Sequence, residues 1–145
     1  MKVKRIDHIG INVNDLAGAK AFFLDLGFEV HWEGGLEGEL LETVVGLPNA
    51  KTSFVMIGLP DSQMNLELIK YHKPIDKRDI QQSFANTLGI RHIAFVVDDI
   101  EATVAKLGKN GVEIFSEIQN YEDTYKLCYI RGPEGIILEL AEQLN

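Results

Sequence analysis

The residues most able to do chemistry are two histidines and two glutamates that recur at matching places in a duplicated sequence. Shifting the chain so that His8 falls on His92 also aligns the apolar and polar residues around each histidine, without a gap. A second shift places Glu67 on Glu139, each between two leucines. Imidazoles and carboxylates together suit first-row divalent metals. The repeat therefore predicts a metal site that takes one histidine and one glutamate from each half.

Alternation along the predicted strands places the four side chains on one face of each half. Successive strand residues point to opposite faces, and apolar residues directly follow each histidine and flank each glutamate. The apolar face is expected to pack on a helix, and the His and Glu residues project from the other face. A carboxylate that is closed off from water needs a partner. A divalent cation is one such partner, and a salt-bridged His–Glu cluster without metal is the alternative.

The elements that position these residues form two similar modules. In the first half we expect strands at 5–13, 28–32, 40–45, 52–57 and 64–69. In the second half we expect strands at 91–97, 112–115, 125–131 and 136–141. Asp15 and Asp99 are predicted to cap one helix in each half, and Gly27 and Gly111 to end these helices. Each half therefore has the layout β-α-β-β-β, and the first half has one extra strand candidate.

The remaining segments are predicted to be connections. The glycines at 34, 35 and 38 indicate a flexible break, and 132–135 a turn. Residues 70–89 form a polar linker with a weakly helical stretch at 79–88. Neither half alone has a large enough core, so we expect α+β class and one domain, 1–145. Its βαβββ modules are about 1–70 and 88–145.

Composition narrows the function classes. The 145 residues carry a net charge of −8, which argues against binding to nucleic acid and to anionic membrane surfaces. Residues 1–8 are charged and strand-like rather than an apolar leader, and we expect a cytoplasmic protein. Cys128 is the only cysteine, and without a neighbouring base it is interpreted as a packing residue.

Other polar residues are weaker candidates. Arg131 shares a strand face with Tyr129, and Arg91 precedes His92. Either arginine is a candidate for binding an anionic group of a small-molecule substrate, and a solvated side chain is the alternative for both. His31 and His72 have no partner in the repeat, and His72 is interpreted as a solvated loop residue.

Four motifs carry a resemblance to a known family: IDHIGI at 6–11, LEL at 66–68, IRHIAF at 90–95 and GPEGIILEL at 132–140. With them the chain resembles the vicinal-oxygen-chelate superfamily of glyoxalases, dioxygenases and bleomycin-binding proteins. The resemblance implies a curled mixed sheet around a cavity, with helices on its outer face. It also implies a divalent metal (Ni, Zn, Co, Mn or Fe) whose ligands are His8, Glu67, His92 and Glu139. A homodimer is implied as well, with the ligands supplied by one chain or by two.

The order His-Glu-His-Glu is similar to glyoxalase I. It implies a metal-dependent lyase or isomerase that moves a proton on a small vicinal-oxygen substrate through an enediolate or enolate. Glu139 or Glu67 is the implied base. Residues 120–135 resemble an unassigned bacterial glyoxalase-like branch, which leaves the use of glutathione open. An Fe(II) ring-cleaving dioxygenase and a metal-free small-molecule binding protein of the same fold are the alternative functions.

Overall fold

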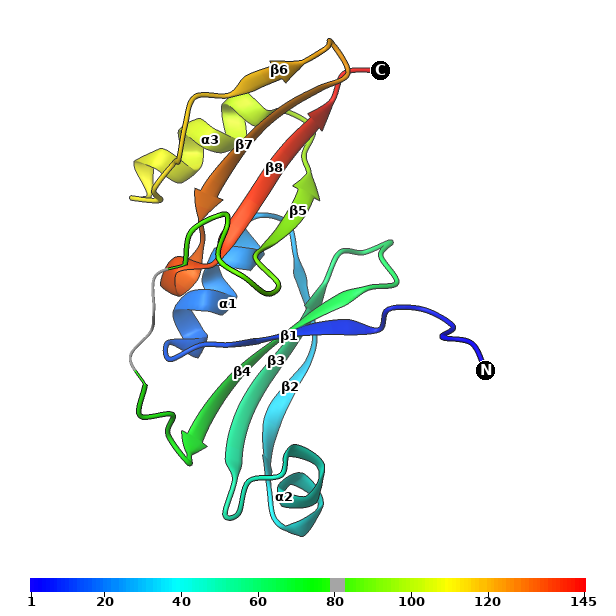
Figure 1. Cartoon of the computed structure of the whole chain (residues 1–145), viewed down its shortest axis with the longest axis vertical. Helices are drawn as coiled ribbons and strands as arrows, with labels where there is room; N and C mark the ends of the chain where they lie inside the picture. Colours follow the sequence, from blue (N-terminus) through cyan, green and yellow to red (C-terminus); the bar gives the residue numbers. More distant parts are fainter. Residues whose placement is uncertain (79–82) are drawn as a thin grey trace. The chain divides into compact units, whose positions relative to one another are not determined.

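The computed structural model describes residues 1–78 and 83–145. The chain divides into two compact units, Met1–Asp79 and Ile80–Asn145, hereafter the first and second units. Each unit has one mixed sheet of four strands and a long helix (Figure 1). The predicted α+β class, with paired modules, is confirmed. That the two units act as one domain stays a prediction.

The first unit is built around a sheet with the strand order β1-β4-β3-β2. Strand β1 is parallel to β4, and the other neighbours are antiparallel. The elements in chain order are β1 (His8–Asn12), α1 (Leu16–Asp25), β2 (Glu29–Glu37), α2 (Glu39–Val45), β3 (Lys51–Gly58) and β4 (Asn65–Lys73). The first and last strands of this unit therefore lie side by side.

The second unit repeats this arrangement with the strand order β5-β8-β7-β6. Strand β5 is parallel to β8, whereas β7 is antiparallel to both β8 and β6. Its elements are β5 (His92–Val96), α3 (Ile100–Lys109), β6 (Gln119–Tyr121), β7 (Tyr125–Arg131), the 3₁₀ turn η1 (Pro133–Gly135) and β8 (Ile137–Gln143). The sequence repeat is thus a repeat of strand order and strand direction.

Both long helices begin and end at the predicted residues. Asp15 accepts a hydrogen bond from Gly18 N at 2.9 Å, and Asp99 accepts one from Ala102 N at 2.9 Å. These carboxylates satisfy amides that have no partner within the first helical turn. Gly27 and Gly111 follow the helices with φ of +99° and +84°, a conformation that favours glycine. Short sequence signals therefore set the lengths of α1 and α3.

One face of each sheet is apolar and packs on a helix. In the first unit α1 contacts β3 and β4, and Phe23 and Leu68 are fully buried. In the second unit α3 contacts β8, where Leu138 and Leu140 are fully buried. Cys128 on β7 is buried in the same core, and this burial raises the pKa of its thiol. The predicted packing role of Cys128 matches this position.

The segment 40–45 was predicted as a strand, and this prediction is wrong. It forms helix α2, which lies beside one end of β2 (Figure 1). Leu40 and Val44, one helical turn apart, are 78% and 74% exposed. Gly46 ends the helix with a left-handed φ of +71°, and its N–H bonds to Glu42 O at 2.9 Å. The β-branched residues of this segment favour a strand. Gly38 and Gly46 bound the segment on both sides, and it forms one short helix between them.

The predicted break is wrong for Gly34 and Gly35, because β2 continues through both residues, whereas Gly38 does lie between β2 and α2. Gly34 and Gly35 pair with Phe54 and Ser53 of β3. A Cβ at Gly35 would lie only 3.2 Å from Thr52 O. Glycine therefore permits a close approach of strands here rather than a flexible loop.

The second unit differs from expectation along its outer edge. Residues 112–115 form no strand, but Ile114 makes an isolated bridge with Ile130. Further along, 119–121 form the unpredicted β6. The predicted helix at 79–88 begins outside the described residues, and 83–88 hold a turn closed by Thr87 N to Phe84 O at 2.9 Å. In the first unit the outer edge of the sheet is one long strand, β2. In the second unit the same edge consists of the isolated bridge at Ile114 and the short strand β6.

Among residues 1–78 and 83–145, no helix has the length and apolar character needed to cross a membrane.

Phe23→Ala is expected to destabilise the protein by about 3–5 kcal/mol, because it leaves a cavity beneath α1. The Phe23 ring is fully buried and meets the Phe28 ring edge to face at 5.5 Å. Urea denaturation measures the loss. Leu24→Ala is the matched control, since Leu24 is 37% exposed, and its cost should stay below about 1 kcal/mol. Equal losses in both variants would contradict this account of the core.

Candidate functional site

In the first unit, parallel pairing brings His8 beside Glu67. Residue pairs in the register are His8 with Asn65 and Gly10 with Glu67. Both side chains leave the sheet on the face opposite the buried Leu66 and Leu68. His8 Nε2 lies 4.0 Å from Glu67 Oε2, and the two side chains are 38% and 23% exposed. The predicted first pair is therefore adjacent.

The other nitrogen of His8 is held by Asp7. His8 Nδ1 lies 2.8 Å from Asp7 Oδ2, and Arg5 contacts the same carboxylate at 3.0 Å. The hydrogen bond with His8, together with the charge of Arg5, lowers the pKa of Asp7. A carboxylate that accepts from Nδ1–H fixes the tautomer in which Nε2 carries the lone pair. His8 therefore presents a ligand atom on the side of Glu67.

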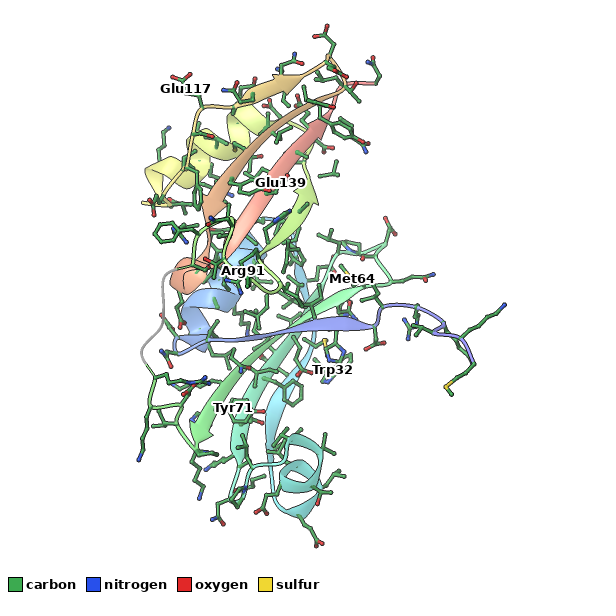
Figure 2. All side chains as sticks on the ribbon, viewed as in Figure 1. Trp32, Met64, Tyr71, Arg91, Glu117 and Glu139 are labelled. Atoms are coloured by element: carbon green, nitrogen blue, oxygen red, sulfur yellow. The ribbon has the colours of Figure 1, made fainter. Side chains whose placement is uncertain are left out.

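In the second unit, His92 and Glu139 occupy the equivalent register. His92 pairs with Ile137, and Ala94 pairs with Glu139 on β8, where Figure 2 labels Glu139. The Tyr129 hydroxyl lies 3.5 Å from His92 Nδ1, and Tyr129 faces Glu139 across β7 and β8. Burial and the charge of Glu139 raise the pKa of Tyr129. The phenol therefore keeps its proton at neutral pH between the two predicted ligands.

The chemistry of these donors fits a divalent metal. The 4.0 Å between His8 Nε2 and Glu67 Oε2 exceeds a hydrogen bond, which is about 3 Å. Two ligands that are each about 2.1 Å from one ion lie roughly 3–4 Å apart, depending on the coordination angle. In both units Nδ1 of the histidine faces another polar group, as is typical of metal-binding histidines. The set His8, Glu67, His92 and Glu139 takes two residues from each unit and stays a prediction.

The weaker predicted residues have other contacts. Arg131 is held above the Phe115 ring at 4.7 Å, and it donates to Gly135 O at 3.2 Å. Glu113 lies 3.5 Å from its Nε. Arg91, labelled in Figure 2, is half-buried just before β5, at the place that Asp7 has before β1. Substrate contacts of Arg131, Tyr129 and Arg91 stay predictions.

Sequence reasoning missed two residues at this face. Asp7 touches His8 directly, and its position next to a predicted ligand was the available signal. His31 lies above Gly58 of the same sheet. It had no partner in the repeat. Its position depends on a β-bulge between Val30 and Trp32, which no sequence signal predicts.

Within the described chain, one group of three acids is compact enough for a cation, namely Asp99, Glu101 and Glu142. Lys126 already supplies positive charge there, at 2.8 Å from Glu101 and 4.0 Å from Glu142. Two of the acids also bind backbone amides at the start of α3, Ala102 N and Ile100 N. This group is therefore a helix cap with its own counter-ion.

The comparisons with known proteins identify the family of the chain. The family model of the Glyoxalase/Bleomycin resistance protein/Dioxygenase superfamily matches residues 5–140. The chain therefore belongs to this superfamily, whose members bind small molecules and commonly use a divalent metal. The match covers both units and all four predicted ligands.

Individual relatives extend over nearly the whole chain. YaeR of Escherichia coli (strain K12) is 30% identical over 142 residues, 97% of this chain and 98% of its own. The crystal structure of a glyoxalase family protein from Bacillus cereus has a TM-score of 0.95 at 36% identity, covering 100% and 97% of the two chains. The fosfomycin resistance protein FosX of Listeria monocytogenes, solved with Mn(II), shares the fold with a TM-score of 0.61 at 17% identity, covering 98% and 94%.

Lys126→Met is expected to lower the melting temperature at neutral pH, because it leaves the acids at the start of α3 without their cation. The lysine lowers the pKa of Glu101, so this contribution is present at neutral pH and is lost as the pH falls through that lowered pKa. The difference from wild type should therefore shrink below the ordinary glutamate value of 4.5. Lys109→Met at the other end of α3 is the control. A difference that is independent of pH would contradict the assignment.

Proposed function

We propose that the protein is a metal-dependent lyase or isomerase of the glyoxalase I type, acting on a small molecule with vicinal oxygens. The observation that carries this proposal is the duplicated His–Glu pair. Each pair stands on the sheet face opposite the helix, in the same parallel register, and each histidine has its Nδ1 next to another polar group. Two copies of one arrangement favour a shared chemical purpose over two unrelated surface pairs.

His8, Glu67, His92 and Glu139 would hold the metal. Two imidazoles and two carboxylates suit Ni²⁺, Zn²⁺, Co²⁺, Mn²⁺ or Fe²⁺. When bound, the ion supplies a Lewis acid that polarises a substrate oxygen. Asp7 orients the imidazole of His8 in this scheme, and its carboxylate makes that ring a better donor.

Glu139 is proposed as the base that takes a proton from substrate carbon and returns it to the neighbouring carbon. It is half-buried, and the fully buried Leu138 and Leu140 on the opposite face hold β8 in the register that directs its carboxylate to the face of His92. Tyr129 faces it with a protonated hydroxyl, since the charge of Glu139 helps to raise the pKa of that phenol. The phenol can donate a hydrogen bond to a substrate oxygen while the carboxylate accepts the proton. Glu67 is the second candidate for the base.

We also propose a homodimer, because members of this superfamily typically work as dimers. Light scattering during size-exclusion chromatography tests this state directly. Mixing His8→Ala chains with His92→Ala chains then tells whether the ligands come from one chain or two. Metal binding that reappears in the mixture requires a site shared between chains.

Glu139→Gln is expected to abolish proton exchange at substrate carbon, because an amide cannot accept the proton. Glu67→Gln should weaken metal binding with a smaller loss of exchange. Metal content by mass spectrometry and solvent deuterium exchange into methylglyoxal-derived hemithioacetals separate the two effects. The control is Glu117→Gln, an exposed residue outside the strands. Full metal content and exchange in both variants would defeat the assignment.

Asp7→Asn is expected to lower metal affinity by about 10–100-fold, because the imidazole of His8 loses the carboxylate that orients it. Isothermal titration with Ni²⁺ and Zn²⁺ measures the affinity. Asp61→Asn, in an exposed turn, removes the same charge away from His8 and should leave affinity unchanged. Wild-type protein should also melt at a higher temperature with these ions. A melting temperature indifferent to every ion would favour a metal-free binding protein.

A further inference from the structure

A β-bulge places a third imidazole on the face of the first sheet that carries His8 and Glu67. Val30 pairs with Ile57 and Trp32 pairs with Met56, which leaves His31 as the extra residue of β2. Bulges re-aim side chains in this way. The His31 ring lies over Gly58, which is two residues from Met56 and therefore on the same face. Met56 is the partner of Glu67, so this face is the one with the predicted ligands.

Gly58 provides the space that His31 shares with Asn65. A Cβ at this position would overlap Asn65 Oδ1 and would lie 2.7 Å from Cε1 and 3.1 Å from Nε2 of His31. Gly58 does not have the positive φ that favours glycine elsewhere in the chain. The missing side chain, rather than backbone conformation, is therefore what this position requires.

Asn65 has a buried oxygen that lacks a partner. Its Oδ1 accepts no hydrogen bond from any of residues 1–78 and 83–145. Asn65 is also the strand neighbour of His8. A buried acceptor without a donor costs about 1–3 kcal/mol, so a bound group that donates to it would gain affinity.

The equivalent positions of the second unit are closed by side chains. Arg131 stands where the first unit has Gly58, and its guanidinium group covers the ring of Phe115, the counterpart of His31. Ile137, the counterpart of Asn65, is 1% exposed. The same fold therefore tolerates a version of this place that is filled by larger side chains. In the first unit the same place holds two polar side chains, His31 and Asn65, above a glycine, and packing does not demand this difference.

We infer that His31 and Asn65 form a subsite that binds a hydroxyl group of the substrate, next to the His8–Glu67 pair. A hydroxyl donates to Asn65 Oδ1 and can also bond to the imidazole nitrogen of His31. This inference rests on the proposed function, and it narrows the substrate class to vicinal-oxygen compounds that carry a further hydroxyl. His31 and Asn65 are specificity-determining residues here and take no part in proton transfer.

The test compares glycerate with lactate on the full-length protein loaded with Ni²⁺. Both probes offer a carboxylate and an adjacent hydroxyl, and glycerate alone has one hydroxyl more. Isothermal titration should show glycerate binding roughly tenfold tighter to wild type, as expected for one hydrogen bond to a buried acceptor. Three variants should bring the ratio of the glycerate and lactate affinities near one. Asn65→Ile and His31→Phe introduce the residues that the second unit has at these positions, and Gly58→Ala adds a Cβ that meets both side chains. His72→Gln should keep the ratio, because His72 bonds to Ser53 at the other end of β3 and β4.

A second measurement separates this inference from the metal site. In metal-free protein, glycerate should shift the NMR signals of the His31 ring and the Asn65 amide, whereas lactate should not. Equal affinities in wild type, or a ratio that survives in Asn65→Ile, would overturn the subsite. Protein that binds no metal but still shows the glycerate-specific shifts would instead overturn the proposed function alone.

Discussion

The parallel pairing of the first and last strands of each unit is the constraint on which the candidate site depends. It places Gly10 opposite Glu67 and Ala94 opposite Glu139, so that the histidine two residues earlier lies on the same face of the sheet as the carboxylate. Side chains alternate along a strand, and a slip of one residue would turn one member of the pair toward the helix. The separation of 4.0 Å between imidazole and carboxylate in the first unit is a product of this register.

The register is in turn held by the apolar side of each sheet. Leu66 and Leu68 flank Glu67 and lie against α1, so moving the carboxylate inward would expose both leucines. Burying one leucine is worth about 1.5–3 kcal/mol, and this outweighs what an exposed ion pair contributes. The helix caps at Asp15 and Asp99 fix where each helix meets its sheet. The hydrophobic core thereby specifies the position of residues that contribute nothing to it.

Most of the strands and both long helices could be predicted from sequence, because they depend on local sequence patterns. Strand alternation indicated which face carries His8 and His92, and aspartate and glycine marked both ends of the long helices. The mistakes occurred where tertiary context overrides propensity. Residues 40–45 have strand-forming composition but lie between glycines that end a helix, and Gly34 and Gly35 serve strand approach. The position of His31 required knowledge of a bulge, which depends on the register of two strands.

The burial of Cys128 gives the second unit a built-in reporter. Its thiol is 3% exposed and has a raised pKa, so reagents that need an accessible thiolate find little of it in the folded state. Because it is the only cysteine, alkylation at neutral pH requires a local opening that exposes this side chain on β7. The labelling of this single sulfur atom therefore reports local opening of the second unit, without any engineered probe.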